Sequence, residues 1–197
     1  MSRWDQRYAE VGWAFGTEPN DFLRQEAHRI PLGRVLCLGE GEGRNAVFLA
    51  KQGFEVVGVD QSGVGMEKAQ DLAREEGVSI ETVVSPMEEF DLQEGEWEGI
   101  VSIFFHPPPD SRRRIHRAVM EGLTRNGVLI LEAYSPKQLE LGTGGPPHLE
   151  RLPTLDLLRE ELEGLDFVVA QEAEREVREG RMHTGRGSVV QVVGIRQ

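Results

Sequence analysis

The sequence predicts an α/β fold in which a mostly parallel sheet lies between two layers of helices and ends in an antiparallel β-hairpin. Residues 34–51 combine an apolar strand, a tight glycine turn and a helical pattern. Apolar runs then alternate with helical periodicity, which is typical of the strand–helix units of a parallel sheet. Two further strands, 166–170 and 187–195, follow one another without a helix between them. These patterns predict a three-layer sandwich around a seven-stranded sheet.

The chain begins with a short helix predicted over residues 3–10. Trp4 and Tyr8 lie one turn apart on it, so they either clamp this helix against the domain or cover a ligand as a lid. Asp21 is predicted to cap a second helix over about residues 22–28. We expect one domain, in which residues 1–30 form a cap segment and residues 34–197 form the core.

The glycine turn is the strongest functional signal. Gly39, Gly41 and Gly43 stand at alternate positions between the first strand and the helix that starts at Arg44. Such a turn lets a ligand approach the main chain, and the free N–H groups of the helix start favour a nucleotide-like ligand. The dinucleotide fingerprint G-x-G-x-x-G/A is met by Gly41, Gly43 and Ala46, which leaves a nicotinamide cofactor open.

An acidic residue ends the second strand. The apolar run 54–59 leads into Asp60, and one carboxylate at this position can accept hydrogen bonds from both hydroxyls of a ribose. Gln61 and Ser62 begin the next helix, and a third strand is predicted at 78–84.

The fourth strand leads to a candidate base. Residues 97–105 run into His106 and three prolines, so the chain turns sharply at the carboxyl end of this strand. Open parallel sheets bind ligands at those ends. A near-neutral pKa makes His106 a candidate base there, and a loop-capping role is the alternative. Ser111 is predicted to cap the following helix, and the fifth strand covers 128–134.

The last third of the chain holds three less specific features. Residues 142–147 are rich in glycine and proline, and we expect either a loop that covers a substrate or a structural turn. Thr154 is predicted to cap the last helix. His183 lies in the polar stretch between the final two strands, where a solvated hairpin tip is the simplest interpretation from composition.

The composition and net charge limit the classes of partner that we expect this protein to bind. A net charge of −12 argues against nucleic acid, because a phosphate backbone is bound by clustered lysines and arginines. The basic run Arg112–Arg114 is expected to be a solvated helix face. No apolar run approaches the ~20 residues that span a bilayer, and the first residues lack an apolar signal core. The five histidines show no metal-binding spacing. We expect a cytoplasmic protein with a small-molecule partner, no membrane contact and no metal.

The chain resembles class I S-adenosylmethionine-dependent methyltransferases, which have a Rossmann-like fold. The resemblance is carried by the glycine turn, by Asp60 with QSGVGMEKAQDLA after it, and by LTRNGVLILEAY at 123–134. WDQRY at 4–8 and GEGEGRNAVFLA at 39–50 are similar to the small tellurite-resistance and thiopurine-type branch. The chain departs from many relatives at Cys37 and Glu40, and it lacks an acidic residue at Pro86.

This resemblance implies a binding site for S-adenosylmethionine. The glycine turn would contact its methionine part, Glu40 its amino group and Arg44 its carboxylate, although a surface position for Arg44 is the more usual one. Trp4 and Tyr8 would cover it, and the loop after the third strand would flank its adenine. His183 matches a histidine that the branch commonly carries. The cofactor-binding candidates are Trp4, Tyr8, Gly39, Glu40, Gly41, Gly43, Arg44, Asn45, Asp60, Gln61, Ser62, Ser85, Met87 and Glu88, and the catalytic candidates are His106 and His183.

The sequence therefore favours an S-adenosylmethionine-dependent methyltransferase acting on a small molecule. Methyl transfer mainly requires that an attacking atom be aligned with an electrophilic methyl group, which explains why no catalytic triad is visible. Two alternatives stay open. The chain could hold the cofactor without turnover, or it could be a nicotinamide-dependent oxidoreductase built on Gly41, Gly43 and Ala46.

Overall fold

The computed structural model describes residues 2–197, which form a seven-stranded sheet with the strand order β3-β2-β1-β4-β5-β7-β6. The first five strands are parallel, and β7 pairs antiparallel with both β5 and β6. This confirms the predicted α/β sandwich and its terminal hairpin. The strands are β1 (Arg34–Leu38), β2 (Glu55–Asp60), β3 (Glu81–Val84), β4 (Trp97–Ile103), β5 (Leu123–Tyr134), β6 (Leu165–Glu179) and β7 (His183–Arg196).

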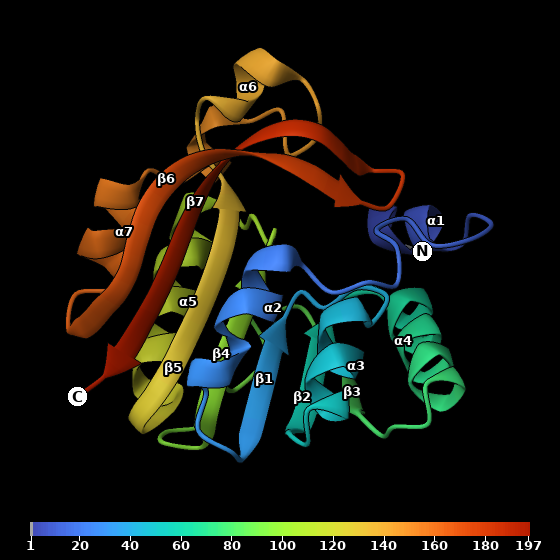
Figure 1. Ribbon diagram of the computed structural model, residues 1–197, viewed down its shortest axis with the longest axis horizontal. Helices are drawn as coiled ribbons and strands as arrows, with labels where there is room; N and C mark the ends of the chain where they lie inside the picture. The colour runs from blue at the N-terminus through green and yellow to red at the C-terminus, as the bar shows by residue number, and fades with distance from the viewer. Residues whose placement is uncertain (1) are drawn as a thin grey trace.

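Helices cover both faces of the sheet (Figure 1). Within residues 2–197, none of them combines the length and apolar character that crossing a membrane would need. The α-helices are α1 (Arg3–Tyr8), α2 (Asp21–Glu26), α3 (Arg44–Lys51), α4 (Gly63–Glu75), α5 (Pro109–Gly122), α6 (Gln138–Leu141) and α7 (Leu155–Glu161). Two 3-10 turns, η1 (Ala27–Arg29) and η2 (Leu149–Arg151), complete the set.

The alternation of side chains along β1 divides the apolar interior into two cores. Val35 and Cys37 point to the side covered by α2, α3 and α4. Leu36 and Leu38 point to the side covered by α5 and α7. Successive side chains of a strand leave opposite faces of a sheet, so a central strand with both faces covered must be apolar throughout.

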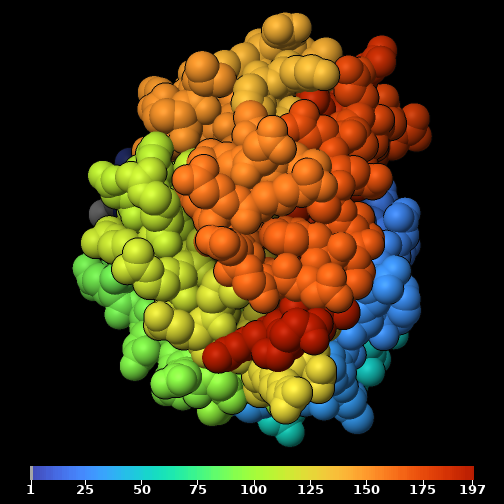
Figure 2. Space-filling view, turned by 90° about the vertical axis from the view of Figure 1, so that its left-hand side faces the viewer, coloured from blue at the N-terminus to red at the C-terminus, as the bar shows by residue number. Residues whose placement is uncertain are grey.

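The terminal hairpin is long, because its two strands continue through the polar stretch between residues 170 and 187, and its tip reaches the N-terminal segment. β6 and β7 pair continuously from Leu165 opposite Arg196 to Glu179 opposite His183, apart from one register shift between Phe167 and Val169. The hairpin passes over the carboxyl ends of the parallel strands toward α1 (Figure 1). At its tip, Met182 N–H donates to the carbonyl of Ala14 at 3.1 Å. Figure 2 shows the side of the molecule where α7 and β6, in orange, close the edge of the sheet.

Two helix starts differ from the prediction. The cap of α2 is Asn20, whose side chain accepts a hydrogen bond from Leu23 N–H, and Asp21 is the first helical residue. Ser111 lies inside α5, because that helix already starts at Pro109 without a side-chain cap. Proline suits a first helical position, since it has no N–H to leave unpaired. Ser62 and Thr154 do cap α4 and α7, as predicted.

The prediction that the run Arg112–Arg114 is a solvated helix face is wrong for Arg112, whereas Arg113 and Arg114 are exposed. Arg112 is buried, and its guanidinium donates to both carboxylate oxygens of Glu161 on α7 at 3.0 to 3.2 Å. His116 Nδ1 lies 2.7 Å from the same carboxylate. The Arg112–Glu161 pair joins α5 to α7. A run of arginines in the sequence does not indicate that one of them pairs with a residue far along the chain.

Candidate functional site

A cavity of about 530 Å³ lies at the carboxyl ends of the parallel strands. Its floor includes the end of β1 and β4, and its walls come from α1, the 144–148 loop and the tip of the β6–β7 hairpin. Ligand sites of roughly 300–1,000 Å³ are usual for small molecules and cofactors. Twelve candidates from the sequence line the cavity: Trp4, Tyr8, Gly39, Glu40, Arg44, Asn45, Asp60, Gln61, Met87, Glu88, His106 and His183.

Four other candidates do not line it. Gly41 and Gly43 are buried, Ser85 is half-buried, and Ser62 is fully buried. Ser62 accepts a hydrogen bond from Gly65 N–H at the start of α4 and donates to the Asp5 carboxylate at 2.6 Å. Its observed contacts therefore hold α1 against α4.

The glycine turn is covered by aromatic side chains. Gly41 has φ of +68°, and a Cβ built there would lie 2.7 Å from the Tyr8 hydroxyl. A Cβ at Gly39 would lie 2.6 Å from the ring of Phe105. Only glycine lets the backbone pass so close beneath these two rings, so the turn and its cover are built together.

Asp60 is held at the tip of β2 by the glycine turn. Its Oδ2 accepts from Gly41 N–H at 3.1 Å, and its Oδ1 accepts from Ser62 N–H at 2.8 Å. Burial raises the pKa of the Asp60 carboxyl, and the two amides oppose that rise. The carboxylate keeps further lone pairs free for hydroxyl groups in the cavity.

Glu40 caps α3. Its Oε1 accepts from the N–H groups of Asn45 and Ala46 at 3.1 and 2.9 Å. Gly43 stands at the N-cap without a side chain, so the carboxylate of Glu40 satisfies donors that would otherwise lack a partner. Burial raises the pKa of the Glu40 carboxyl to about 7, against the effect of these amides.

Arg44 does not occupy the surface position that is more usual for an arginine. Arg44 is buried, and its Nη2 lies 2.6 Å from Glu179 Oε2 at the end of β6. Its Nη1 is buried and has no hydrogen-bond partner among residues 2–197. Asn45 beside it accepts from Asn20 N–H at 3.0 Å. The first turn of α3 thus connects to the hairpin and to the N-terminal segment, and one guanidinium nitrogen remains unused at the cavity.

The two histidine candidates have different surroundings. His106 Nδ1 donates to the Phe104 carbonyl at 2.9 Å, and its Nε2 accepts from Tyr134 N–H at 2.9 Å. Burial lowers the pKa of His106 to about 4, so the ring is neutral and both nitrogens are bound to the backbone. His183 Nδ1 is also buried, but it has no partner within residues 2–197. Burial first, and then the charge of Arg44, lowers the pKa of His183 well below its usual range.

An aromatic cluster beside His183 was not predicted. The ring of Phe104 stacks on Tyr134 at 4.5 Å between centroids and meets His183 edge-on at 4.7 Å. Phe15 lies 4.6 Å from His183 on another side. Phe104 has φ of +51°, an unfavourable conformation for a residue with a side chain. Such strain at the end of β4 marks a position where the direction of the ring matters.

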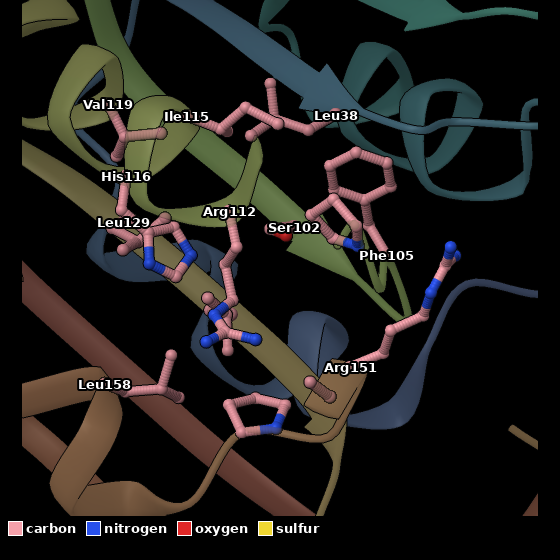
Figure 3. A pocket seen from close by; sticks show the side chains of 14 residues that line it. Leu38, Ser102, Phe105, Arg112, Ile115, His116, Val119, Leu129, Arg151 and Leu158 are labelled. Carbon is pink, nitrogen blue, oxygen red and sulfur yellow. The ribbon is translucent and has the colours of Figure 1, made fainter. Parts of the chain in front are cut away.

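A second cavity, of about 10 Å³, lies under η2 (Figure 3). It has room for about one water molecule, which excludes a cofactor there. Leu38, Phe105 and Arg151 line both cavities. No group of three or more His, Cys, Asp or Glu side chains in the described part of the chain could hold a metal ion.

Residues 35–127 match the family model of a methyltransferase domain. This match assigns the segment from β1 into β5 to a methyltransferase domain. Among solved structures, it resembles TehB from Haemophilus influenzae with a TM-score of 0.72 and 18% identity, over 90% of this chain and 62% of that one. It resembles an S-adenosylmethionine-dependent methyltransferase from Methanosarcina mazei with a TM-score of 0.71 and 18% identity, over 91% and 98% of the two chains. At these identities the likeness concerns the fold.

A curated relative is the 23S rRNA (uracil(747)-C(5))-methyltransferase of Pyrococcus horikoshii. It is 25% identical over 121 residues, which are 56% of this chain and 28% of the relative. The methyltransferase domain thus corresponds to little more than a quarter of that enzyme.

Proposed function

We propose that residues 1–197 form a single methyltransferase domain that transfers a methyl group from S-adenosylmethionine to a small-molecule acceptor. The observation that carries this proposal is the cavity at the carboxyl ends of the strands, which joins the Asp60 carboxylate to the aromatic cluster around His183. One end suits a nucleoside, and the other is enclosed enough to exclude water from a reacting group.

The residues at the first end fit the cofactor. Asp60 would accept from the ribose hydroxyls, and Met87 and Glu88 would flank the adenine. Glu88 supplies an acidic side chain near the position where Pro86 departs from the family pattern. Arg44 Nη1, buried without a partner among residues 2–197, would donate to the carboxylate of the methionine part. Glu40 accepts from the amides of α3 and would support the turn that holds the cofactor.

The residues at the second end would orient the acceptor. Bound S-adenosylmethionine supplies an electrophilic methyl group, so this chain has to align a nucleophile and handle its proton. His183 Nδ1 is unpaired within the described residues and would accept a hydrogen bond from the attacking group or take its proton. His106 would act by position, because its two nitrogens fix the backbone at Phe104 and Tyr134.

RNA is the competing acceptor class, because the curated relative methylates 23S rRNA. The net charge of −12 argues against it, since RNA binding requires positive potential over a wide surface. The walls of the cavity also argue for a small molecule, because the 144–148 loop and the hairpin tip enclose it from two sides.

The test is methyl transfer from cofactor with a labelled methyl group, to a panel of small thiols, amines, hydroxyls and acids and, separately, to 23S rRNA. We expect label in a small molecule, and a loss of roughly a hundredfold in kcat for His183→Asn with unchanged affinity for S-adenosylhomocysteine. His28→Asn, an exposed histidine on η1 away from the cavity, is the matched control and should retain full activity. Label in RNA alone would contradict the small-molecule acceptor, and cofactor binding without transfer to any acceptor would support the non-catalytic alternative.

A further inference from the structure

The cavity is lined by three arginines without an ion-pair partner among residues 2–197, one of which, Arg7, lies over the Trp4 ring at 5.3 Å. Arg3 and Arg7 on α1 and Arg151 on η2 line its wall. Arg44, Arg112 and Arg175 are each paired with a buried glutamate. Within residues 2–197, no such ion pair involves Arg3, Arg7 or Arg151. In a chain with a net charge of −12, three unpaired cations around one cavity point to an anionic ligand.

Three of the four acidic residues that line the same cavity are already bound to protein donors, and the fourth, Glu88, is exposed. Glu42 Oε2 accepts from Ala14 N–H at 2.8 Å, and Glu42 Oε1 lies 2.8 Å from Lys68 Nζ. Glu40 and Asp60 accept from backbone amides of the glycine turn and of the helices that follow. These acidic side chains therefore do not neutralise the arginines, and they lie toward the cofactor end.

The backbone next to Arg151 is held in place by Arg112. Arg112, itself pinned by Glu161, donates from Nη1 to the carbonyl of Glu150 at 3.1 Å. The main chain next to Arg151 is thus anchored to α5 and α7, whereas its side chain makes no hydrogen bond or ion pair with residues 2–197. In Figure 3 the Arg151 guanidinium points away from Arg112, on the side of Phe105. Arg151 also lies close enough to His106 for its charge to lower the pKa of that ring.

Aromatic side chains line this end of the cavity, with the rings of Phe104 and Phe15 tilted by 71° and 52° against His183. Phe104 keeps its strained φ of +51° and meets His183 edge-on, and the Phe15 ring lies 4.6 Å from that of His183. Phe104, His183 and Phe15 all line the cavity. Aromatic walls prefer flat, unsaturated partners, which stack on or meet the ring edge-on.

We infer that the methyl acceptor is a small planar acid, whose anionic group binds Arg151 and whose flat ring packs against Phe104 and His183. This inference rests on the proposed function and specifies the substrate class for it. Arg3 and Arg7 add positive potential at the mouth of the cavity and would guide such an anion toward it.

Three probes separate the effect of a ligand's charge on affinity from the effect of its planar ring. They are benzoate, its neutral isostere benzamide, and the non-planar cyclohexanecarboxylate. Each is titrated by NMR into protein saturated with S-adenosylhomocysteine, so that the carboxylate of the cofactor product already occupies its own site. We expect benzoate to bind at least about tenfold more tightly than either of the other two. Equal affinities for benzoate and benzamide would overturn the role of charge, and equal affinities for the two acids would overturn the planar slot.

Variants locate the anion site. Arg151→Gln should weaken benzoate binding about tenfold, Arg151→Lys should restore part of it, and benzamide should be unaffected. Arg125→Gln removes the same charge from an exposed position outside the cavity and should change nothing. An unchanged dissociation constant for benzoate in Arg151→Gln would overturn the assignment. The affinity for S-adenosylhomocysteine, measured first, separates a failure of this inference from a failure of the cofactor site itself.

Discussion

The guanidinium of Arg44 lies 2.6 Å from the carboxylate of Glu179, and both side chains are buried. This contact joins the first turn after the glycine loop to the end of the terminal hairpin. Glu179 Oε1 also accepts from Asn20 at 3.0 Å and from Arg175 at 2.6 Å. Arg175 in turn pairs with Glu132, which is fully buried at the end of β5. One polar network therefore holds the hairpin, the N-terminal segment and the cofactor end of the cavity together.

Removing Glu179 should be costly, because it leaves the buried Arg44 without its counter-charge and takes one of two glutamate partners from the half-buried Arg175. Glu179→Ala is expected to lower the free energy of unfolding by about 3 kcal/mol. Glu174→Ala on the same strand removes an exposed partner of Arg186 and should cost about 0.5 kcal/mol or less. Urea unfolding of both variants measures the difference. Equal losses would mean that the buried network does not hold the hairpin.

Two glycines with the same backbone conformation provide a second test. Gly43 has φ of +96° and Gly53 has φ of +94°, so alanine is strained at both positions. A Cβ at Gly43 would lie 2.7 Å from Ala69 Cα, whereas nothing lies within 4 Å of one at Gly53. Gly53→Ala should cost about 1 kcal/mol and Gly43→Ala about 2 kcal/mol more, because α3 must move away from α4. The denaturation midpoints of the two variants measure this difference in stability. Similar midpoints would contradict the close packing at Gly43.

Glu40 should make stability depend on pH. Burial raises its pKa in the folded state from 4.5 to about 7, so the folded protein keeps a proton that the unfolded chain releases. The contribution of this carboxyl to stability is complete below pH 4.5 and is lost as the pH rises through about 7. Glu40→Gln cannot titrate and can still accept from the α3 amides. Relative to the wild type, it should gain about 3 kcal/mol between pH 4.5 and 8. Unfolding curves at several pH values test this, and a difference that does not change with pH would refute it.

The parts of the fold that the sequence predicts correctly are those with local signals. The glycine turn, Asp60 at the end of β2 and the caps Ser62 and Thr154 depend on residues within a few positions of each other. The third strand is shorter than predicted because Val78 N–H still bonds to Ala73 at the end of α4. The helix start at Asp21 was wrong by one residue because Asn20 is an equally good cap.

Much of the cavity wall could not be predicted, because it is made by contacts between distant segments. Arg112 and Glu161 are 49 positions apart, and nothing near either residue indicates the other. Phe15, Phe104 and His183 come from three separate elements, and only the arch of the hairpin brings them together. Aromatic residues at the ends of strands are common, so their positions alone did not indicate an acceptor pocket.

The central claim is that Asp60 and the glycine turn bind an adenosyl cofactor, and calorimetry tests it most directly. S-Adenosylmethionine, S-adenosylhomocysteine and NADH are titrated into the wild type, into Asp60→Ala and into Asp166→Ala, an exposed control on β6. We predict that both adenosyl ligands bind, that NADH does not, and that Asp60→Ala alone weakens binding by about tenfold or more. Binding of NADH without the adenosyl ligands, or full affinity in Asp60→Ala, would contradict the account.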